Sequence, residues 1–244
     1  MNAEPAAQRR LLDLAGADAE LDRTAHRRRM LPELTEIADI ESQLQARRDA
    51  VVAADTAISD IDRDSQRLEI EIEAVRARED RDRNLLRQGV GVRQVSDLEH
   101  ELDTLKRRQT VLEDELLELM ERRETADADA AKAREALASA ESQLADTSAR
   151  RDAAFAELDE ITQRRGADRA RLAAGLPSDL LALYDRIRAQ KGTGAALLRA
   201  RRCESCRLEL DRSALVKLRD AAPDEVLRCE ECGVVLVRTL ESGL

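Results

Sequence analysis

The chain has 244 residues, of which 43% are hydrophobic and 38% charged, but it contains one Phe, one Tyr and no Trp. Aromatic side chains supply much of the buried area in compact cores, so this chain has to bury itself with Leu, Ile, Val and Ala, as helices packed on helices do. Nine Gly and four Pro are too few for the turns of a β-sandwich or a doubly wound sheet. The net charge of −10 disfavours wholesale binding of nucleic acid or of an anionic membrane.

The compartment is predicted from the apolar segments. No apolar run approaches the length of about 18 residues that spans a bilayer. The N-terminal segment MNAEPAAQRRLLDLAGADAEL lacks the apolar region of a signal peptide. We therefore expect a cytoplasmic protein with no membrane partner, in which the four cysteines are reduced or metal-bound rather than joined in disulfides.

The first part of the chain is predicted to form two helices separated at Pro32. Proline lacks the backbone N–H and clashes with the preceding turn, so it cannot lie in a helix interior. This places a first helix at about residues 5–30 and a break near residue 32. From Leu34 to Leu86, and again from Leu98 to Ile161, apolar residues recur at alternating steps of three and four. That heptad spacing predicts a coiled coil.

A bend is predicted near residues 88–95, where Gly89 and Gly91 interrupt the pattern. Ser96 and Glu99 fit a capping box that would begin the second arm, which then continues to about residue 174. The two arms form an antiparallel hairpin in which paired residue numbers add up to about 183. The alanine-rich segment 50–57 then faces residues 126–133. The sequence leaves open whether the arms pair within one chain or swap between two.

A short helix and a hinge are predicted after the hairpin. Gly175 and Pro177 end the second arm, and Ser178 would cap a helix over residues 179–190. Lys191-Gly192-Thr193-Gly194 is too short for a phosphate-binding loop and is interpreted as a flexible joint. The expected divisions are therefore a hairpin at 1–175, a short helix with a hinge at 176–194, and a C-terminal domain at 195–244.

Four cysteines carry the strongest chemical signal. Two Cys-x-x-Cys pairs lie 22 residues apart, and each pair can supply two thiolates to a tetrahedral zinc ion from one tight turn. Gly233 fits a turn that needs unusual dihedral angles. A thioredoxin-like pair would need a single motif in a βαβ unit, and iron–sulfur clusters use tighter cysteine runs. The predicted ligands of one structural Zn²⁺ are Cys203, Cys206, Cys229 and Cys232.

The residues around these cysteines change from helical to strand-like patterns. Strands are predicted at residues 195–198 and 234–237, and a helix over residues 213–221. A segment of this size with few large apolar groups needs a metal to fold. The fold class is thus mainly α: a long antiparallel coiled-coil hairpin with a small β-rich zinc ribbon that contains a helical insert.

This combination resembles the bacterial coiled-coil zinc-ribbon family. The resemblance covers the whole chain: the Leu-Pro-Glu-Leu break at 31–34, the bend followed by residues 95–101, Tyr184 before a small helix, and then the two cysteine pairs. It implies that the four cysteines hold zinc. It also implies binding roles, with RNA, an alternative sigma factor or secretion components as partners in different members, and no enzymatic activity.

A basic strip is the candidate nucleic-acid site. Between residues 186 and 202 the sequence has six basic residues and no acidic one, whereas residues 203–244 have six basic and nine acidic residues. Clustered Arg and Lys are what phosphate contacts require. The residues of this strip are Arg186, Arg188, Lys191, Arg199, Arg201 and Arg202.

The leading functional hypothesis is a non-enzymatic adaptor. The ribbon and hinge would dock a protein partner, a nucleic acid or both, and the coiled coil would act as a spacer or interaction arm. One alternative is an RNA- or DNA-binding regulator that acts through residues 186–202. The other is a thiol-based switch that releases zinc on oxidation. An enzyme is not expected, because His100-Glu101 lacks the second His of a zinc-protease motif.

Overall fold

The computed structural model describes all 244 residues, which divide into two compact units. One unit comprises Met1–Leu34 and Arg150–Leu244, and the other comprises Thr35–Ala149. The elements in chain order are α1 (Pro5–Arg29), α2 (Pro32–Arg87), α3 (Val92–Ala174), α4 (Ser178–Lys191), β1 (Ala195–Arg199), β2 (Arg202–Cys203), α5 (Arg212–Asp220), β3 (Leu227–Arg228), β4 (Val235–Val237) and η1 (Leu240–Ser242).

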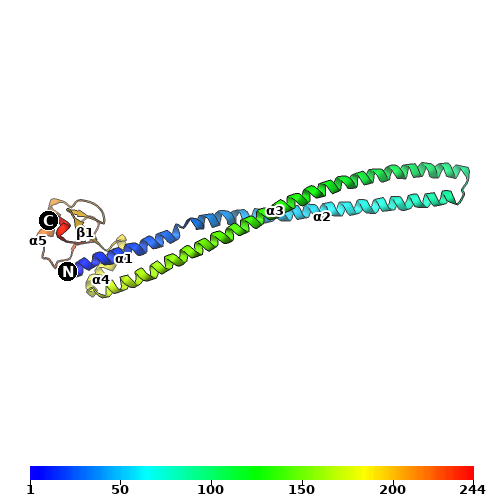
Figure 1. Cartoon of the computed structure of the whole chain (residues 1–244). Coiled ribbons are helices and arrows are strands. Elements are labelled where there is room, and N and C mark those ends of the chain that lie inside the picture. The colour runs from blue at the N-terminus through cyan, green and yellow to red at the C-terminus, as the bar shows by residue number, and fades with distance from the viewer. The chain divides into compact units, whose positions relative to one another are not determined.

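The unit Thr35–Ala149 is an antiparallel helical hairpin formed by α2 and α3 of one chain (Figure 1). Its buried positions follow the heptad, as Ile37 with Leu44 and Leu105 with Leu112 show. The guanidinium of Arg47 donates to the carbonyl of Ala136 at 2.8 Å, in the expected register. The predicted coiled-coil hairpin is confirmed.

The bend between the arms is shorter than the sequence indicated. The turn covers residues 88–91, and Gly89 has the positive φ of 80° that lets the chain reverse. The predicted start of the second arm at Ser96 is wrong, because α3 already begins at Val92. The Val95 N–H donates to the Gly91 carbonyl at 3.1 Å, so a helical turn has formed before Ser96 is reached.

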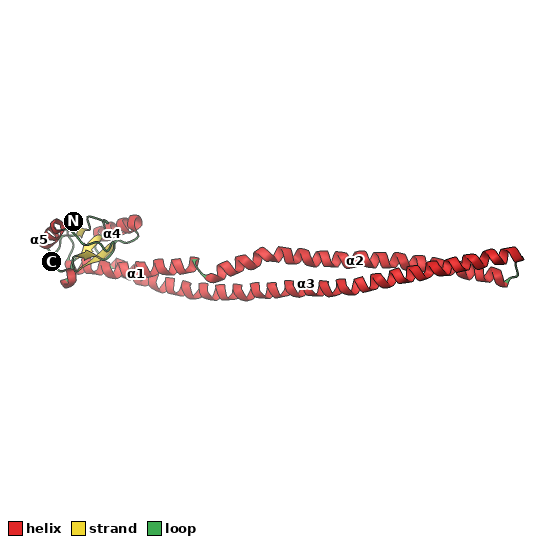
Figure 2. Cartoon of the chain, turned by 90° about the horizontal axis from the view of Figure 1, so that it is seen from above, coloured by secondary structure: helices red, strands yellow, loops and turns green.

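Pro32 and Pro177 both lie at the start of a helix, where proline is tolerated. The break at Met30 and Leu31 separates α1 from α2, and Pro32 is the first residue of α2 (Figure 2). Ser178 does not cap α4 as predicted. It is the first helical residue, Pro177 occupies the N-cap position, and no side chain bonds to the helix end.

The C-terminal residues form a four-stranded sheet in the order β2-β1-β4-β3. Strand β1 pairs parallel with β4 and antiparallel with β2, and β3 pairs antiparallel with β4. The helical insert α5 begins with a side-chain cap, in which Asp211 accepts from the Ala214 N–H at 2.7 Å. The small strand-containing ribbon with a helical insert is therefore confirmed.

The ribbon shares one hydrophobic core with α1 and α4. This core joins Leu11 and Leu14 of α1, Tyr184 of α4, and the buried strands β1 and β4. The first residues of the chain extend the contact, since the Ala3 N–H donates to the Asp224 carbonyl at 2.7 Å and the Val226 N–H to the Met1 carbonyl at 3.0 Å. The ribbon is therefore stabilised by a sequence-distant helix as well as by its own residues.

The expected flexible joint at residues 191–194 is a packed contact instead. Gly192 has a φ of 80° and ends α4, while Gly194 is buried against the ring of Tyr184. The Gly194 carbonyl also accepts a hydrogen bond from the Val235 N–H at 3.0 Å. The two glycines allow a tight turn and a close approach of the backbone to an aromatic ring. The sequence pattern had indicated a flexible segment instead.

The Gly194 contact predicts a strong effect of one methyl group. A Cβ at this position would lie 2.5 Å from two ring carbons of Tyr184. We expect Gly194→Ala to lower the free energy of unfolding of the ribbon by about 1–3 kcal/mol, as overpacking does. The measurement is urea unfolding followed by tyrosine fluorescence, which reports Tyr184 alone because the chain has a single Tyr and no Trp.

The matched control is Gly16→Ala on α1, where an added Cβ meets nothing within 4 Å. Alanine is the better helix former, so this variant should gain up to about 1 kcal/mol. Equal stability of the two variants would contradict the packed role of Gly194.

Candidate metal centre

Two cysteine turns of the same geometry carry the candidate metal ligands. In the first turn, the Cys203 N–H donates to the Leu208 carbonyl at 3.1 Å, and the Arg207 N–H donates back to the Cys203 carbonyl at 2.7 Å. In the second turn, Cys229 bonds to Val234 and Gly233 bonds to Cys229 in the same way, both at 2.9 Å. Each turn therefore aims two sulfur atoms toward a common centre.

Each turn needs one residue with positive φ directly after its second cysteine. Gly233 has a φ of 81°, as the sequence suggested, and the equivalent position in the first turn is Arg207 with a φ of 61°. The left-handed conformation costs a non-glycine residue about 1–2 kcal/mol. The backbone hydrogen bonds of the turn hold Arg207 in this conformation. An arginine would not have been expected there from the sequence alone.

The four sulfur atoms have the spacing of a tetrahedral zinc site. All of them lie within 4.8 Å of one another, with the Sγ atoms of Cys203 and Cys232 separated by 3.8 Å and those of Cys206 and Cys229 by 4.0 Å. A tetrahedron with Zn–S bonds of about 2.3 Å has edges of about 3.8 Å. A disulfide would need a separation of about 2 Å. The donor set and spacing therefore fit one Zn²⁺ held by four thiolates.

The surroundings of the thiols differ from one to the next. Burial raises the pKa of the Cys203 thiol to about 12 and also raises the pKa of Cys229. Burial opposes ionisation of Cys232 as well, but hydrogen bonds from the Val234 backbone and from neighbouring thiols outweigh it and lower its pKa. A cysteine loses its proton when it binds zinc, so the bound ion replaces protons that the folded ribbon would otherwise retain.

Two family models match the two parts of this architecture. Residues 14–192 match the CT398-like coiled coil hairpin domain, and residues 202–236 match the C4-type zinc ribbon domain. The chain belongs to the CT398-like family. The ribbon match contains all four cysteines, so the predicted family and the structural Zn²⁺ are both confirmed.

Related chains have the same extent. An uncharacterised protein of Mycobacterium tuberculosis is 44% identical over 98% of each chain. A solved Mycobacterium smegmatis structure has 40% identity and a TM-score of 0.86, covering 98% of this chain and 100% of that one. The structure of CT398 from Chlamydia trachomatis has 18% identity and a TM-score of 0.64, covering 94% and 96%, and shares the fold.

Four of the six residues of the basic strip have acidic side chains or a backbone carbonyl as partners in this member of the CT398-like family. Arg199 pairs with Glu204 at 3.6 Å and Glu241 at 3.2 Å, and Arg202 pairs with Glu209 at 3.4 Å. Arg201 donates to the Gly243 carbonyl at 3.0 Å. Acidic residues outside the strip therefore offset much of its charge.

The three residues of the strip that lie on α4 differ in their surroundings. Arg186 and Lys191 are exposed and form no ion pair, whereas Arg188 faces the interior between α4 and α1. Arg188 Nε lies 3.2 Å from Oδ2 of Asp18, and Nη2 donates to Asp22 at 3.1 Å. Its position is that of a structural arginine.

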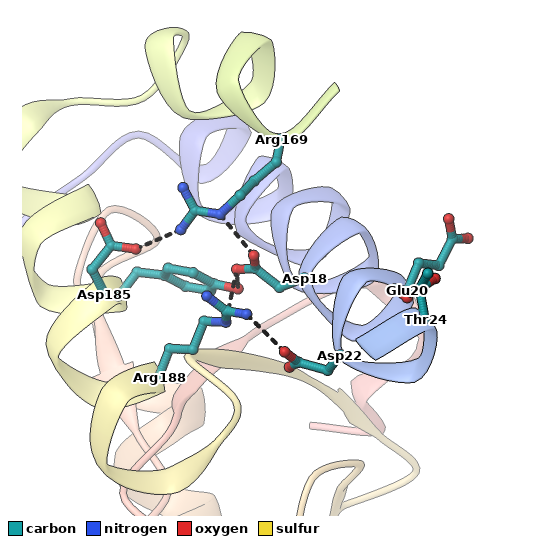
Figure 3. A network of polar contacts seen from close by, with 8 residues as sticks. Asp18, Glu20, Asp22, Thr24, Arg169, Asp185 and Arg188 are labelled. Atoms are coloured by element: carbon teal, nitrogen blue, oxygen red, sulfur yellow. Dashed lines mark hydrogen bonds and ion pairs between the residues drawn. The ribbon is translucent and has the colours of Figure 1, made fainter. Parts of the chain in front are cut away.

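Asp18 is the centre of a buried polar network (Figure 3). Its Oδ2 accepts from the Tyr184 hydroxyl at 2.7 Å, and its Oδ1 accepts from Arg169 Nε at 2.7 Å. Arg169 also donates to Asp185 at 2.8 Å. The network links α1, the end of α3 and α4, which are the three helices next to the ribbon.

Asp18 and Arg169 were not among the residues predicted from the sequence. A signal was present, because Asp18 continues the apolar spacing of Ala7, Leu11 and Leu14 on α1. A carboxylate in such a stripe indicates a buried partner. Its identity could not be predicted, because Arg169 lies 151 residues away in the sequence.

Zinc removal should unfold the ribbon and expose Tyr184. We expect the purified protein to carry one equivalent of zinc and Cys229→Ser to lose most of it, since breaking the tetrahedral set removes the folding energy that the metal supplies. Quenching of tyrosine fluorescence by acrylamide should rise, and the circular dichroism of the coiled coil should change little.

Ser205→Ala is the matched control for zinc binding. Ser205 lies between Cys203 and Cys206, is exposed and offers no thiolate. This variant should keep both the zinc and the quenching of the parent protein. A zinc-free Cys229→Ser protein with Tyr184 still protected would contradict the structural role of the metal.

Tyr184 predicts a loss of stability at high pH. Burial, and next the hydrogen bond to Asp18, raise the pKa of Tyr184 far above its usual value of about 10. In the unfolded chain the phenol ionises near pH 10 while the folded chain keeps it neutral. The free energy of unfolding should therefore be intact below pH 10 and fall above it, by at most about 1.4 kcal/mol per pH unit.

Tyr184→Phe isolates this effect. The variant should lose about 1–3 kcal/mol at pH 7, because Asp18 loses a buried donor, and its stability should fall less between pH 9 and 11. The measurement is urea-induced zinc release to a metal-sensitive dye. Parallel pH profiles for the two proteins would count against the assignment.

Proposed function

We infer that the chain is a non-enzymatic zinc-ribbon adaptor that docks an acidic segment of a protein partner. Four thiolates fill the tetrahedral coordination of the zinc, and a catalytic zinc ion would keep one position open for water or substrate. This closed coordination supports a structural metal. No helix combines the length and apolar composition that crossing a membrane requires.

A hollow beside the first cysteine turn is the observation that carries the docking proposal. It has a volume of about 520 Å³, and three arginines line it together with Cys203 and the carboxylate of Glu204. These arginines are Arg199, Arg202 and Arg207. Leu208, half exposed, follows directly in the chain. Three arginines against one lining carboxylate, together with the apolar neighbour, fit an acidic segment that carries a hydrophobic residue.

The ion pairs in this hollow are weak enough to exchange. Arg199 and Arg202 have side chains that are 62% exposed, and their carboxylate partners lie 3.2 to 3.6 Å away. Exposed pairs of this kind contribute about 0–1 kcal/mol. An acidic partner can therefore replace Glu204, Glu209 or Glu241 at little cost to the fold.

Protein is favoured over single-stranded nucleic acid by the placement of the aromatic residues. Proteins that bind single strands stack bases on aromatic rings. Tyr184 is fully buried here, and the ring of Phe155 lies under the guanidinium of Arg28, 4.4 Å from the ring centroid. With one Phe, one Tyr and no Trp, the chain has no further ring, and Phe155 is only partly exposed.

A capture experiment with matched charge variants tests the docking surface. The zinc-loaded full chain is immobilised and exposed to nuclease-treated native extract, and retained proteins are compared among variants. We expect a partner that survives nuclease to be lost when Arg199, Arg202 and Arg207 are replaced by Gln, because its carboxylates lose their cations. Replacement of Arg63, Arg67 and Arg122 by Gln, which removes the same charge from the coiled coil, should retain it.

The other outcomes separate the alternatives. Loss of the partner on nuclease treatment would favour the nucleic-acid regulator over the protein adaptor. Equal retention by both triple variants would exclude the hollow as the docking site. Mild oxidation that releases zinc and partner together, and is reversed by reductant, would favour the thiol switch.

A further inference from the structure

A groove between α1 and α3, within the unit that contains the ribbon, has an excess of arginine. It has a volume of 630 Å³, in the range of small-ligand sites. Four arginines and two carboxylates line it, namely Arg23, Arg27, Arg164, Arg165, Glu20 and Asp168. A positive groove is a local exception in a chain of net charge −10.

The two carboxylates of the groove are already neutralised. Arg165 Nε lies 2.5 Å from Glu20, and Arg165 Nη1 lies 3.5 Å from Asp168. Asp168 also pairs with Arg171, which lies outside the groove. An anion entering the groove would therefore meet carboxylates whose charge is offset by neighbouring guanidinium groups.

Arg23 and Arg27 are the free cations of the groove. Both side chains are exposed, neither forms an ion pair, and they lie one helical turn apart on the same face of α1. Arg164 lies across the groove on α3, held only by an exposed pair with Glu160 at 3.1 Å. The planar fork of guanidinium matches phosphate oxygens in a bidentate manner, so these three side chains can grip an oligophosphate from two helices.

The floor of the groove is fixed and has an apolar part. Thr24 is buried and its hydroxyl donates to the Glu20 carbonyl at 2.9 Å, and Ile161 of α3 completes the lining. Figure 3 shows Glu20 and Thr24 on the side of α1 away from Asp18 and Asp22. The Asp18 network therefore contacts α1 on the side opposite to these two groove residues.

We propose that this groove binds an oligophosphate, either free or as the tail of a nucleotide. Three guanidinium groups that line one groove favour a multiply charged phosphate over a single carboxylate or sulfate. The site is separate from the hollow beside the zinc and does not depend on the docking function proposed above.

Titration calorimetry of the zinc-loaded full chain with inorganic triphosphate is the test. We expect a Kd below about 1 mM at low salt, weakened by added NaCl because the contact is exposed, and weaker binding of sulfate. Arg23→Gln combined with Arg27→Gln should weaken triphosphate binding by about tenfold or more. Zinc content is measured after each titration, because triphosphate also binds divalent cations.

The matched control is Arg63→Gln combined with Arg67→Gln on α2. This pair has the same spacing and the same loss of charge, but each arginine already pairs with an aspartate. The control should bind triphosphate like the parent protein. Undetectable binding by the parent, or equal weakening in both double variants, would overturn the proposal.

A comparison of ATP with triphosphate identifies the source of the phosphate. Tighter binding of ATP would show that the nucleoside contacts the groove beside Ile161, and the ligand is then a nucleotide. Equal binding of the two would assign the groove to the oligophosphate alone. Either result supports the site, and circular dichroism of both double variants confirms that the helices are intact.

Discussion

The zinc coordination is the constraint on which the C-terminal fold depends. The strands of the ribbon have five, two, two and three residues, which is too few to hold a sheet by their own ladder. Four thiolates at one centre fix the two cysteine turns relative to each other. The strands next to these turns are thereby fixed as well. The metal thereby supplements a core to which the ribbon itself contributes few large apolar side chains.

The core that surrounds the zinc turns extends beyond the ribbon and ties it to the helices. Tyr184 is fully buried in it, and its hydroxyl reaches the carboxylate of Asp18 on α1. A buried carboxylate is tolerated only where charged or polar partners compensate it, and here Arg169 and Arg188 do so. The ribbon consequently packs on α1 and α4, and the docking surface proposed for it is held against those helices.

Periodicity and ligand spacing predicted the parts of this fold that depend on local sequence. The heptads, the break at Pro32 and the four cysteines are each visible within a short window, and the structure confirms them. The start of α3 was placed too late, because a capping-box pattern at Ser96 competes with a helix that Gly91 can already begin. A local motif does not report which of two nearby starts is used.

The charge patterns show why the candidate site was harder to predict than the metal. Residues 186–202 contain no acid in sequence, yet Asp18, Glu209 and Glu241 come to them from three other segments. Conversely, Arg23 follows Asp18, Glu20 and Asp22 in sequence, yet neither Arg23 nor Arg27 forms an ion pair in the structure. Basic residues in the last turn of a helix stabilise its dipole, which accounts for Arg27, but this effect fades within one turn. Arg23 lies more than one turn from the C-terminal end of α1, pairs with no carboxylate and lines the groove. Stabilisation of the helix dipole therefore does not explain a positive charge at this position.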